Sequence, residues 1–111
     1  MSHCYHVHLS VYPLGSSEPL RVQAAVREAW VAPAWVNRRE LRGAWLFEAV
    51  MEAPLPEGDD LAAFAESLSV AIWQRIGRYV KVVVDASRED TDDSRRRELG
   101  RTDYLKLMRA V

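Results

Sequence analysis

The sequence is short of the residues that staple small proteins or build common catalytic loops. Its single cysteine, Cys4, excludes an intramolecular disulfide and a cysteine-based zinc knuckle. Five glycines are few, and we find no glycine-rich phosphate loop, nucleophile elbow or helical metalloprotease motif. No apolar stretch approaches the roughly 18 residues that a membrane-spanning helix needs. The sequence therefore contains none of the standard motifs of these enzyme classes.

Neither sign of charge is in large excess. The net charge is -1 over 111 residues, so no overall field favours nucleic acid or an acidic membrane. Hydrophobic residues make up 49%, which is ordinary for one globular domain and too high for a disordered chain. Residues 1–4 lack the charged leader and apolar run of a signal peptide. We therefore expect a cytoplasmic protein with no membrane contact.

The chain begins with an alternating segment. In residues 5–12, apolar and polar side chains alternate. The apolar set is Val7, Leu9 and Val11, and the polar set is His6, His8 and Ser10. A period of two is typical of a β-strand with one apolar and one polar face. This pattern predicts a first strand whose imidazoles point away from the core.

Two later segments have the apolar spacing of amphipathic helices. Residues 16–31 start with serines, an acid and a proline, which favour a helix N-terminus, and Pro33 stops the helix. The second helix starts at Asp59 and Asp60 and ends at Gly77, a typical C-terminal cap. Its apolar stripe is clear: Leu61, Phe64, Ala65, Leu68, Ile72 and Ile76.

Residues 35–53 have the pattern of a β-hairpin. Arg42 and Gly43 are its most turn-like residues. The first arm, residues 36–41, is charged and reads as an edge strand, where charges discourage aggregation. The second arm alternates cleanly, with one face made of Trp45, Phe47, Ala49 and Met51. A last strand is predicted over residues 79–85.

The order strand, helix, strand, strand, helix, strand predicts an α+β fold, a two-layer ferredoxin-like βαββαβ sandwich. We assign this domain to residues 1–86. Residues 87–111 are predicted to be a charged linker, or a solvated helix, followed by a C-terminal helix that packs on the domain or on a partner. Thr102 and Asp103 are the predicted cap of that last helix.

A two-layer sandwich leaves one sheet face uncovered. The predicted members of this face are His6, His8, Ser10, Leu46, Glu48, Val50, Lys81 and Val83. An exposed patch that mixes apolar and polar groups usually marks a partner. Either the tail lays Leu105 and Met108 across it, or a second copy covers it in a homodimer. Trp73 falls off the stripe of its helix and is predicted to be an exposed interface anchor.

The two histidines of the first strand also suggest a metal site. Side chains at positions i and i+2 of a strand point the same way, so His6 and His8 can share one divalent metal if a carboxylate joins them. Glu48, on a neighbouring strand, is the candidate carboxylate. The alternative is that both histidines are ordinary surface residues.

The His6-Val7-His8 triplet resembles the His-hydrophobic-His motif of HUH endonucleases. The resemblance implies a sheet flanked by helices, a divalent metal and a tyrosine nucleophile on a helix, for which Tyr104 is the candidate. Glu48 and Tyr104 would then be catalytic residues of a nucleic-acid phosphodiester enzyme. The net charge argues against this function, because such enzymes normally show a basic footprint.

The segment from Arg42 to Phe47 resembles the Arg-Gly-aromatic segment of RNA recognition motifs. Stacking on RNA needs aromatic side chains on the open face, whereas the alternation places Trp45 and Phe47 on the core side. Our first hypothesis is therefore a non-enzymatic interaction or accessory module that acts through its open face and tail as a homodimer. A metal-dependent phosphodiester enzyme and an RNA-binding domain are the alternatives.

Overall fold

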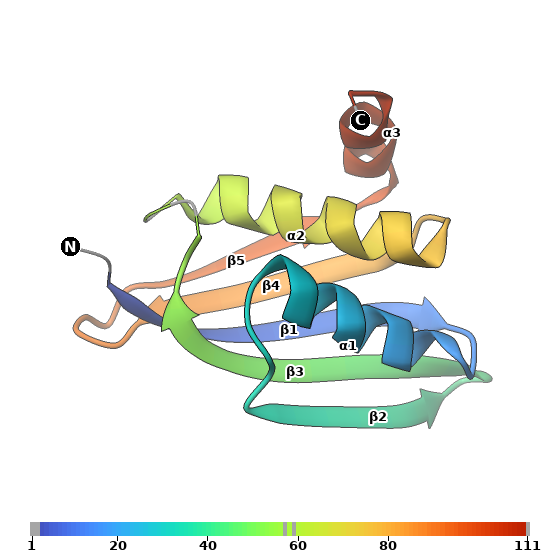
Figure 1. The fold of residues 1–111 in the computed structure, drawn as a ribbon, viewed down its shortest axis with the longest axis horizontal. Coiled ribbons are helices and arrows are strands. Elements are labelled where there is room, and N and C mark those ends of the chain that lie inside the picture. The colour runs from blue at the N-terminus through green and yellow to red at the C-terminus, as the bar shows by residue number, and fades with distance from the viewer. Residues whose placement is uncertain (1–2, 57, 59, 111) are drawn as a thin grey trace.

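Within residues 3–56, 58 and 60–110, which the computed structural model describes, five strands and three helices follow one another along the chain (Figure 1). Their bounds are β1 (Cys4–Leu14), α1 (Glu18–Ala29), β2 (Trp35–Leu41), β3 (Ala44–Pro54), α2 (Leu61–Ile76), β4 (Lys81–Arg88), β5 (Ser94–Leu99) and α3 (Arg101–Arg109).

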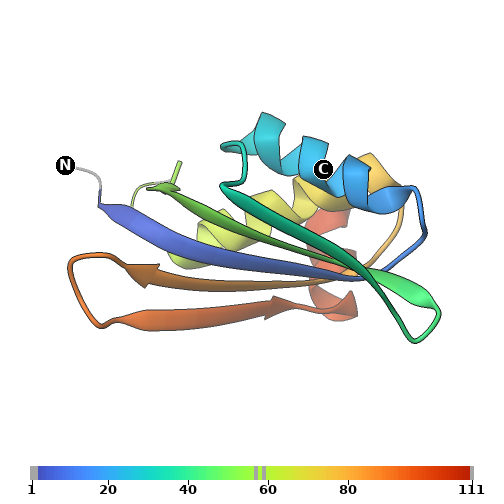
Figure 2. The same cartoon turned by 90° about the horizontal axis from the view of Figure 1, so that it is seen from below.

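The strands form one antiparallel sheet in the order β2-β3-β1-β4-β5. Helices α1 and α2 lie side by side on one face of this sheet, and the opposite face carries no helix among the described residues (Figure 2). The core lies between the helices and the sheet. The predicted mixed α+β architecture is therefore confirmed.

Strand β1 lies at the centre of the sheet and alternates as predicted. The side chains of Val7, Leu9 and Val11 are fully buried, whereas His6 is exposed and His8 is half-buried. Central strands bury one face against the helical layer, so their register is fixed by the apolar set. Because β3 and β4 both pair with β1, the alternation of β1 fixes which of their residues lie on the helical side of the sheet and which on the opposite side.

The β2–β3 hairpin turns where the sequence predicted. Arg42 and Gly43 both have positive φ angles, 54° and 80°, as a two-residue hairpin turn of the primed type requires. Leu41 pairs with Ala44 and Trp35 pairs with Val50. Strand β2 has a single neighbour, so the predicted edge position is confirmed.

The helices begin and end close to the predicted positions. Ser17 is the N-cap of α1, but its side chain makes no capping bond; instead the Gly15 N–H donates to Oε1 of Glu18 at 2.7 Å. In α2 the Ala63 N–H donates to Oδ1 of Asp60 at 3.1 Å, and Gly77 ends the helix with φ 86°. Asp59, the other predicted cap, lies outside the described residues.

The charged segment after β4 differs from the prediction. Ser94–Leu99 forms strand β5 on the free edge of β4, where we expected a linker or a solvated helix. The buried anchor is Leu99, and Arg96 lies across from Asp85 in the register. Cross-strand ion pairs stabilise a sheet despite the polar composition. Residues 94–99 thus belong to the same sheet as β1, β2, β3 and β4.

Candidate interaction surface

The open face is the side of the sheet that faces away from α1 and α2. The register extends each row across all five strands, so that Trp35, Val50, His8, Asp85 and Arg96 are successive neighbours. Every residue predicted for this face lies on it. Several further residues of the face were missed by the sequence reasoning, among them Trp35, Asn37 and Arg39 on β2, Glu52 on β3, Asp85 on β4, and Arg96 and Glu98 on β5.

The apolar part of the open face gathers over β2 and β3. Leu46 and Val50 are half-buried, and Trp35, the partner of Val50, is 49% exposed. Val83 adds a half-buried apolar side chain on β4. Partly exposed apolar side chains on one sheet face are a source from which interfaces gain free energy.

A polar cluster around Glu48 lies between Leu46 and Val50 on the open face. The Glu48 side chain is only 20% exposed. Its Oε1 accepts from Nδ2 of Asn37 at 3.2 Å and lies 3.8 Å from Nε of Arg39, while Oε2 lies 3.5 Å from Nε2 of His8. The carboxylate is thus already surrounded by donors of its own chain.

The charges on β4 and β5 pair in the same way. Nζ of Lys81 lies 2.9 Å from Oε1 of Glu98, and this hydrogen bond and charge hold the pKa of the Glu98 carboxyl below its usual value. Arg96 lies between Asp85 at 3.5 Å and Glu98 at 3.7 Å. On the β1–β3 side, His6 Nδ1 lies 3.2 Å from Glu52 Oε1. The Glu48, Asp85 and Glu98 carboxylates each therefore lie within 4 Å of an arginine or lysine of the same chain.

The residues of the metal and HUH hypotheses do not come together. His6 faces Glu52, whereas His8 faces Glu48, so each imidazole has a different carboxylate. Among the described residues, no three metal-ligating side chains gather. Tyr104 packs edge-on against Trp73 at 5.2 Å on the helical side, so the sheet separates it from both histidines. The geometry gives the phosphodiester enzyme no assembled site.

One predicted interaction residue, Trp73, is placed differently from the prediction. Trp73 is fully buried, and its Nε1–H donates to the Val80 carbonyl at 2.8 Å. It is covered because β5 widens the sheet beneath α2 and α3 adds Tyr104 beside it. Trp73 is a core residue, so the prediction that it is exposed was wrong.

The tail also takes another position. Helix α3 packs against α2 and the end of β5, beside the helical layer (Figure 1). Met108 is half-buried against the core, while Leu105 is 55% exposed. Neither side chain lies across the open face, so this face is not covered by the described part of the chain.

The aromatic residues that resemble an RNA recognition motif face the core, as the alternation predicted. Phe47 is fully buried, and Trp45 is half-buried and packs against the core cluster. The open positions beside them belong to Leu46 and Ala44. A base-stacking surface is therefore not formed by these aromatics.

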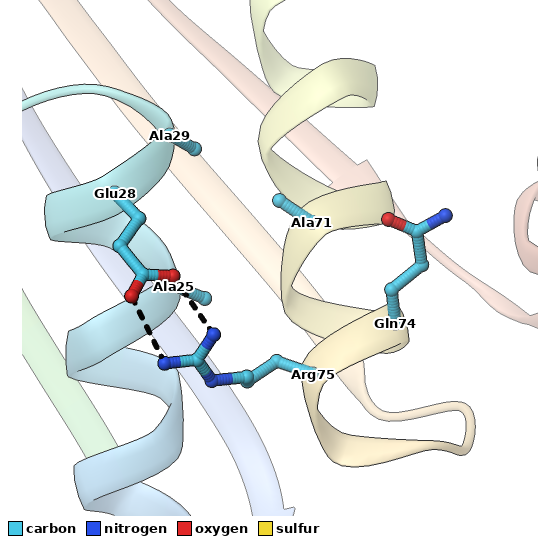
Figure 3. A pocket seen from close by; sticks show the side chains of 6 residues that line it. All are labelled: Ala25, Glu28, Ala29, Ala71, Gln74 and Arg75. Carbon is cyan, nitrogen blue, oxygen red and sulfur yellow. Dashed lines mark hydrogen bonds and ion pairs between the residues drawn. The ribbon is translucent and has the colours of Figure 1, made fainter.

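A second surface feature lies in the helical layer. A shallow groove of about 380 Å³ runs between α1 and α2, and Ala25, Ala29 and Ala71 line it (Figure 3). Glu28 and Arg75 point toward one another across it and form two hydrogen bonds, at 2.8 and 3.2 Å. The groove is a helix–helix junction with small residues, bridged by an exposed ion pair.

Some of the missed residues of the open face could have been predicted from the sequence, and others could not. The β2 residues follow from the two-residue turn, because pairing outward from Arg42 and Gly43 places Trp35 opposite Val50. Strand β5 left almost no signal, because its one buried side chain, Leu99, stands at its end. Only pairing with β4 brings Arg96 and Glu98 onto the face.

The fold defines a class, a mixed α+β domain with one uncovered sheet face, and the comparisons add no narrower assignment. No family model, curated protein or solved structure matches the chain. None of the helices in the described ranges combines the length and the apolar character needed to cross a bilayer.

Proposed function

We propose that this protein is a non-enzymatic interaction or accessory module that self-associates through its open face. Its framework is a ferredoxin-like sandwich, residues 4–88, extended by β5 and α3. Support for this framework is the neighbour order β2-β3-β1-β4 with both crossover helices on one face. The cytoplasmic setting remains a prediction from the sequence.

The observation that carries the proposal is the internal pairing of the charges on a partly apolar face. Burying an unpaired charge costs several kcal/mol, which prevents most polar surfaces from associating. Here Glu48, Asp85 and Glu98 keep their partners when a second surface covers them. Burial of Trp35, Leu46 and Val50 then contributes favourable free energy.

A second copy is the occupant that we propose, and the size of the face fits one. Five strands about 4.8 Å apart and roughly eight residues long give a plane of roughly 600 Å². Standard interfaces bury about 800 Å² of accessible surface per partner, and a rough surface exceeds its projected area. In a two-fold dimer the same patch of both copies forms the interface, so each charge meets a copy of its own surface. A face whose charges are paired internally needs no charge of opposite sign from the partner.

The test is sedimentation velocity over a concentration series from about 1 to 500 µM, a range that brackets ordinary homodimer affinities. We expect a monomer–dimer equilibrium in the wild type. Leu46→Lys replaces an apolar side chain of the open face by a charged one and should yield a monomer with an unchanged far-ultraviolet circular dichroism spectrum.

The matched control is Leu20→Lys. Leu20 lies on α1 in the helical layer and is 62% exposed, so the same change in chemistry falls on the other side of the molecule. This variant should dimerise as the wild type does. A wild type that stays monomeric throughout, or a dimer that Leu20→Lys disrupts while Leu46→Lys does not, overturns the proposal.

A further inference from the structure

The two hairpin tips of the sheet carry opposite charges. The β2–β3 tip, residues 38–42, contains three arginines and one acid, Arg38, Arg39, Arg42 and Glu40. The β4–β5 tip, residues 89–93, contains four acids and no base. Two of these acids, Asp90 and Asp93, pair with the flanking Arg88 and Arg95, yet the tip retains an excess of negative charge.

The basic tip has few internal partners. Arg39 lies on the open face, 3.8 Å from Glu48. Arg38 pairs with the buried Phe47 and so belongs to the helical side of β2. Arg42, at the turn, forms no ion pair among the described residues. Arg42 stands at the turn itself, with an exposed side chain. Its charge is available to a second molecule without breaking a contact that the chain already makes.

These tips lie at diagonally opposite corners of the sheet. The β2–β3 turn follows the end of β1 at Leu14, whereas the β4–β5 turn adjoins its start at Tyr5. Strands β2 and β5 are also the two edges of the sheet. Both views place the hairpins at opposite ends of the long dimension, which is 40 Å (Figures 1 and 2). The near-neutral chain is thus electrically polar along the diagonal of its sheet.

This polarity discriminates between the ways in which two open faces can stack. A two-fold axis along the line that joins the tips places each tip over its own counterpart, acid over acid and base over base. An axis across that line places each acidic tip over the basic tip of the other copy. Stacked sheets are about 10 Å apart, which is comparable with the Debye length of about 8 Å at physiological salt. The charges therefore interact across the interface.

Resting on the proposed function, we propose that two copies stack face to face with the two-fold axis across the line of the tips. The partner of the basic tip around Arg42 is then the acidic 89–93 tip of a second copy of this chain. Like charges placed opposite each other are a cost that this arrangement avoids. Two such contacts form per dimer, because the symmetry repeats each one.

Charge reversal at each tip tests the arrangement. Arg42→Glu and Asp92→Arg each replace attraction by repulsion in both contacts, so each should raise the dimer dissociation constant about five- to tenfold, the size typical of exposed ion pairs counted twice. The double variant restores opposite charges at the two tips and should recover most of the wild-type affinity. The measurement is sedimentation velocity at about 50 mM salt, where screening is weak.

Arg27→Glu is the control for net charge. Arg27 is exposed in the last turn of α1, in the helical layer and away from both tips, so this variant should dimerise as the wild type does. A dimer that either tip variant tightens, or that all three single variants leave unchanged, overturns the arrangement while the proposed self-association stands. A monomeric wild type overturns the proposed function itself.

Discussion

At the scale of single residues, Trp73 shows how helical spacing can mislead. Its position falls beside the main apolar stripe of α2, which suggests a solvent-facing side chain. The indole is nonetheless fully buried, with its N–H bound to the Val80 carbonyl and its ring 5.2 Å from that of Tyr104. The apolar face of α2 is wider than one stripe because it packs on both the sheet and α3.

We expect Trp73→Ala to be severely destabilising. It removes the largest buried side chain of the core and leaves the Val80 carbonyl without its donor. Truncation of a buried Trp typically costs about 3–5 kcal/mol in the free energy of unfolding. Urea unfolding followed by circular dichroism, at protein concentrations low enough for the monomer, measures this loss.

Trp35→Ala is the matched control, because Trp35 is 49% exposed on the open face. Under the same conditions its free energy of unfolding should stay within about 0.5 kcal/mol of the wild type, as is usual for surface positions. Equal losses in the two variants would contradict the buried position of Trp73.

At the scale of elements, the ends of helices and strands follow from local chemistry wherever a turn or a cap requires a positive φ angle. Gly77 ends α2 with φ 86°, a conformation that residues with a Cβ adopt only at a cost. A Cβ at this position would meet no atom within 4 Å. The requirement for glycine is therefore one of backbone conformation and not of space.

Gly77→Ala should lower the free energy of unfolding by about 1–2 kcal/mol, the cost of a left-handed backbone for an ordinary residue. Gly15→Ala is the comparison: its φ lies outside the left-handed region, and its Cβ would lie 3.5 Å from Oε1 of Glu18, an ordinary contact. Thermal unfolding of both variants measures the difference. A larger loss for Gly15→Ala would contradict this account of the cap.

At the scale of the whole molecule, β5 and α3 complete the domain. Leu99 is fully buried, and the ring of Tyr104 packs on that of Trp73, so the C-terminal residues supply core contacts for α2. They also cover the edge of β4, which would otherwise expose unpaired backbone groups to aggregation.

Truncation after residue 93 should therefore abolish cooperative unfolding, because it removes β5 and α3 together. Truncation after residue 100 removes only α3 and should leave a cooperative but less stable fold, with Leu99 retained. Near-ultraviolet circular dichroism and urea unfolding distinguish these outcomes. A chain of residues 1–93 that unfolds as cooperatively as the full chain would restore the division at residue 86 that the sequence suggested.

The sequence by itself determined the elements whose signals are local. The alternation of Val7, Leu9 and Val11 predicted β1, helical spacing and caps predicted α1 and α2, and Arg42 with Gly43 predicted the hairpin turn. From these signals the β1, β3 and β4 part of the open face also followed in outline, including Leu46, Glu48 and Val50. Such patterns are readable because each residue's role depends on neighbours a few positions away.

Only the tertiary structure decided the conformation of the charged tail and the burial of Trp73. Residues 94–99 become a strand because β4 offers a free edge and one acidic partner, Asp85, and neither is encoded within the segment. Long-range contacts likewise separate Tyr104 from His6 and His8 and give each imidazole its own carboxylate. Which residues meet across the fold depends on packing between distant segments, which a local pattern does not contain.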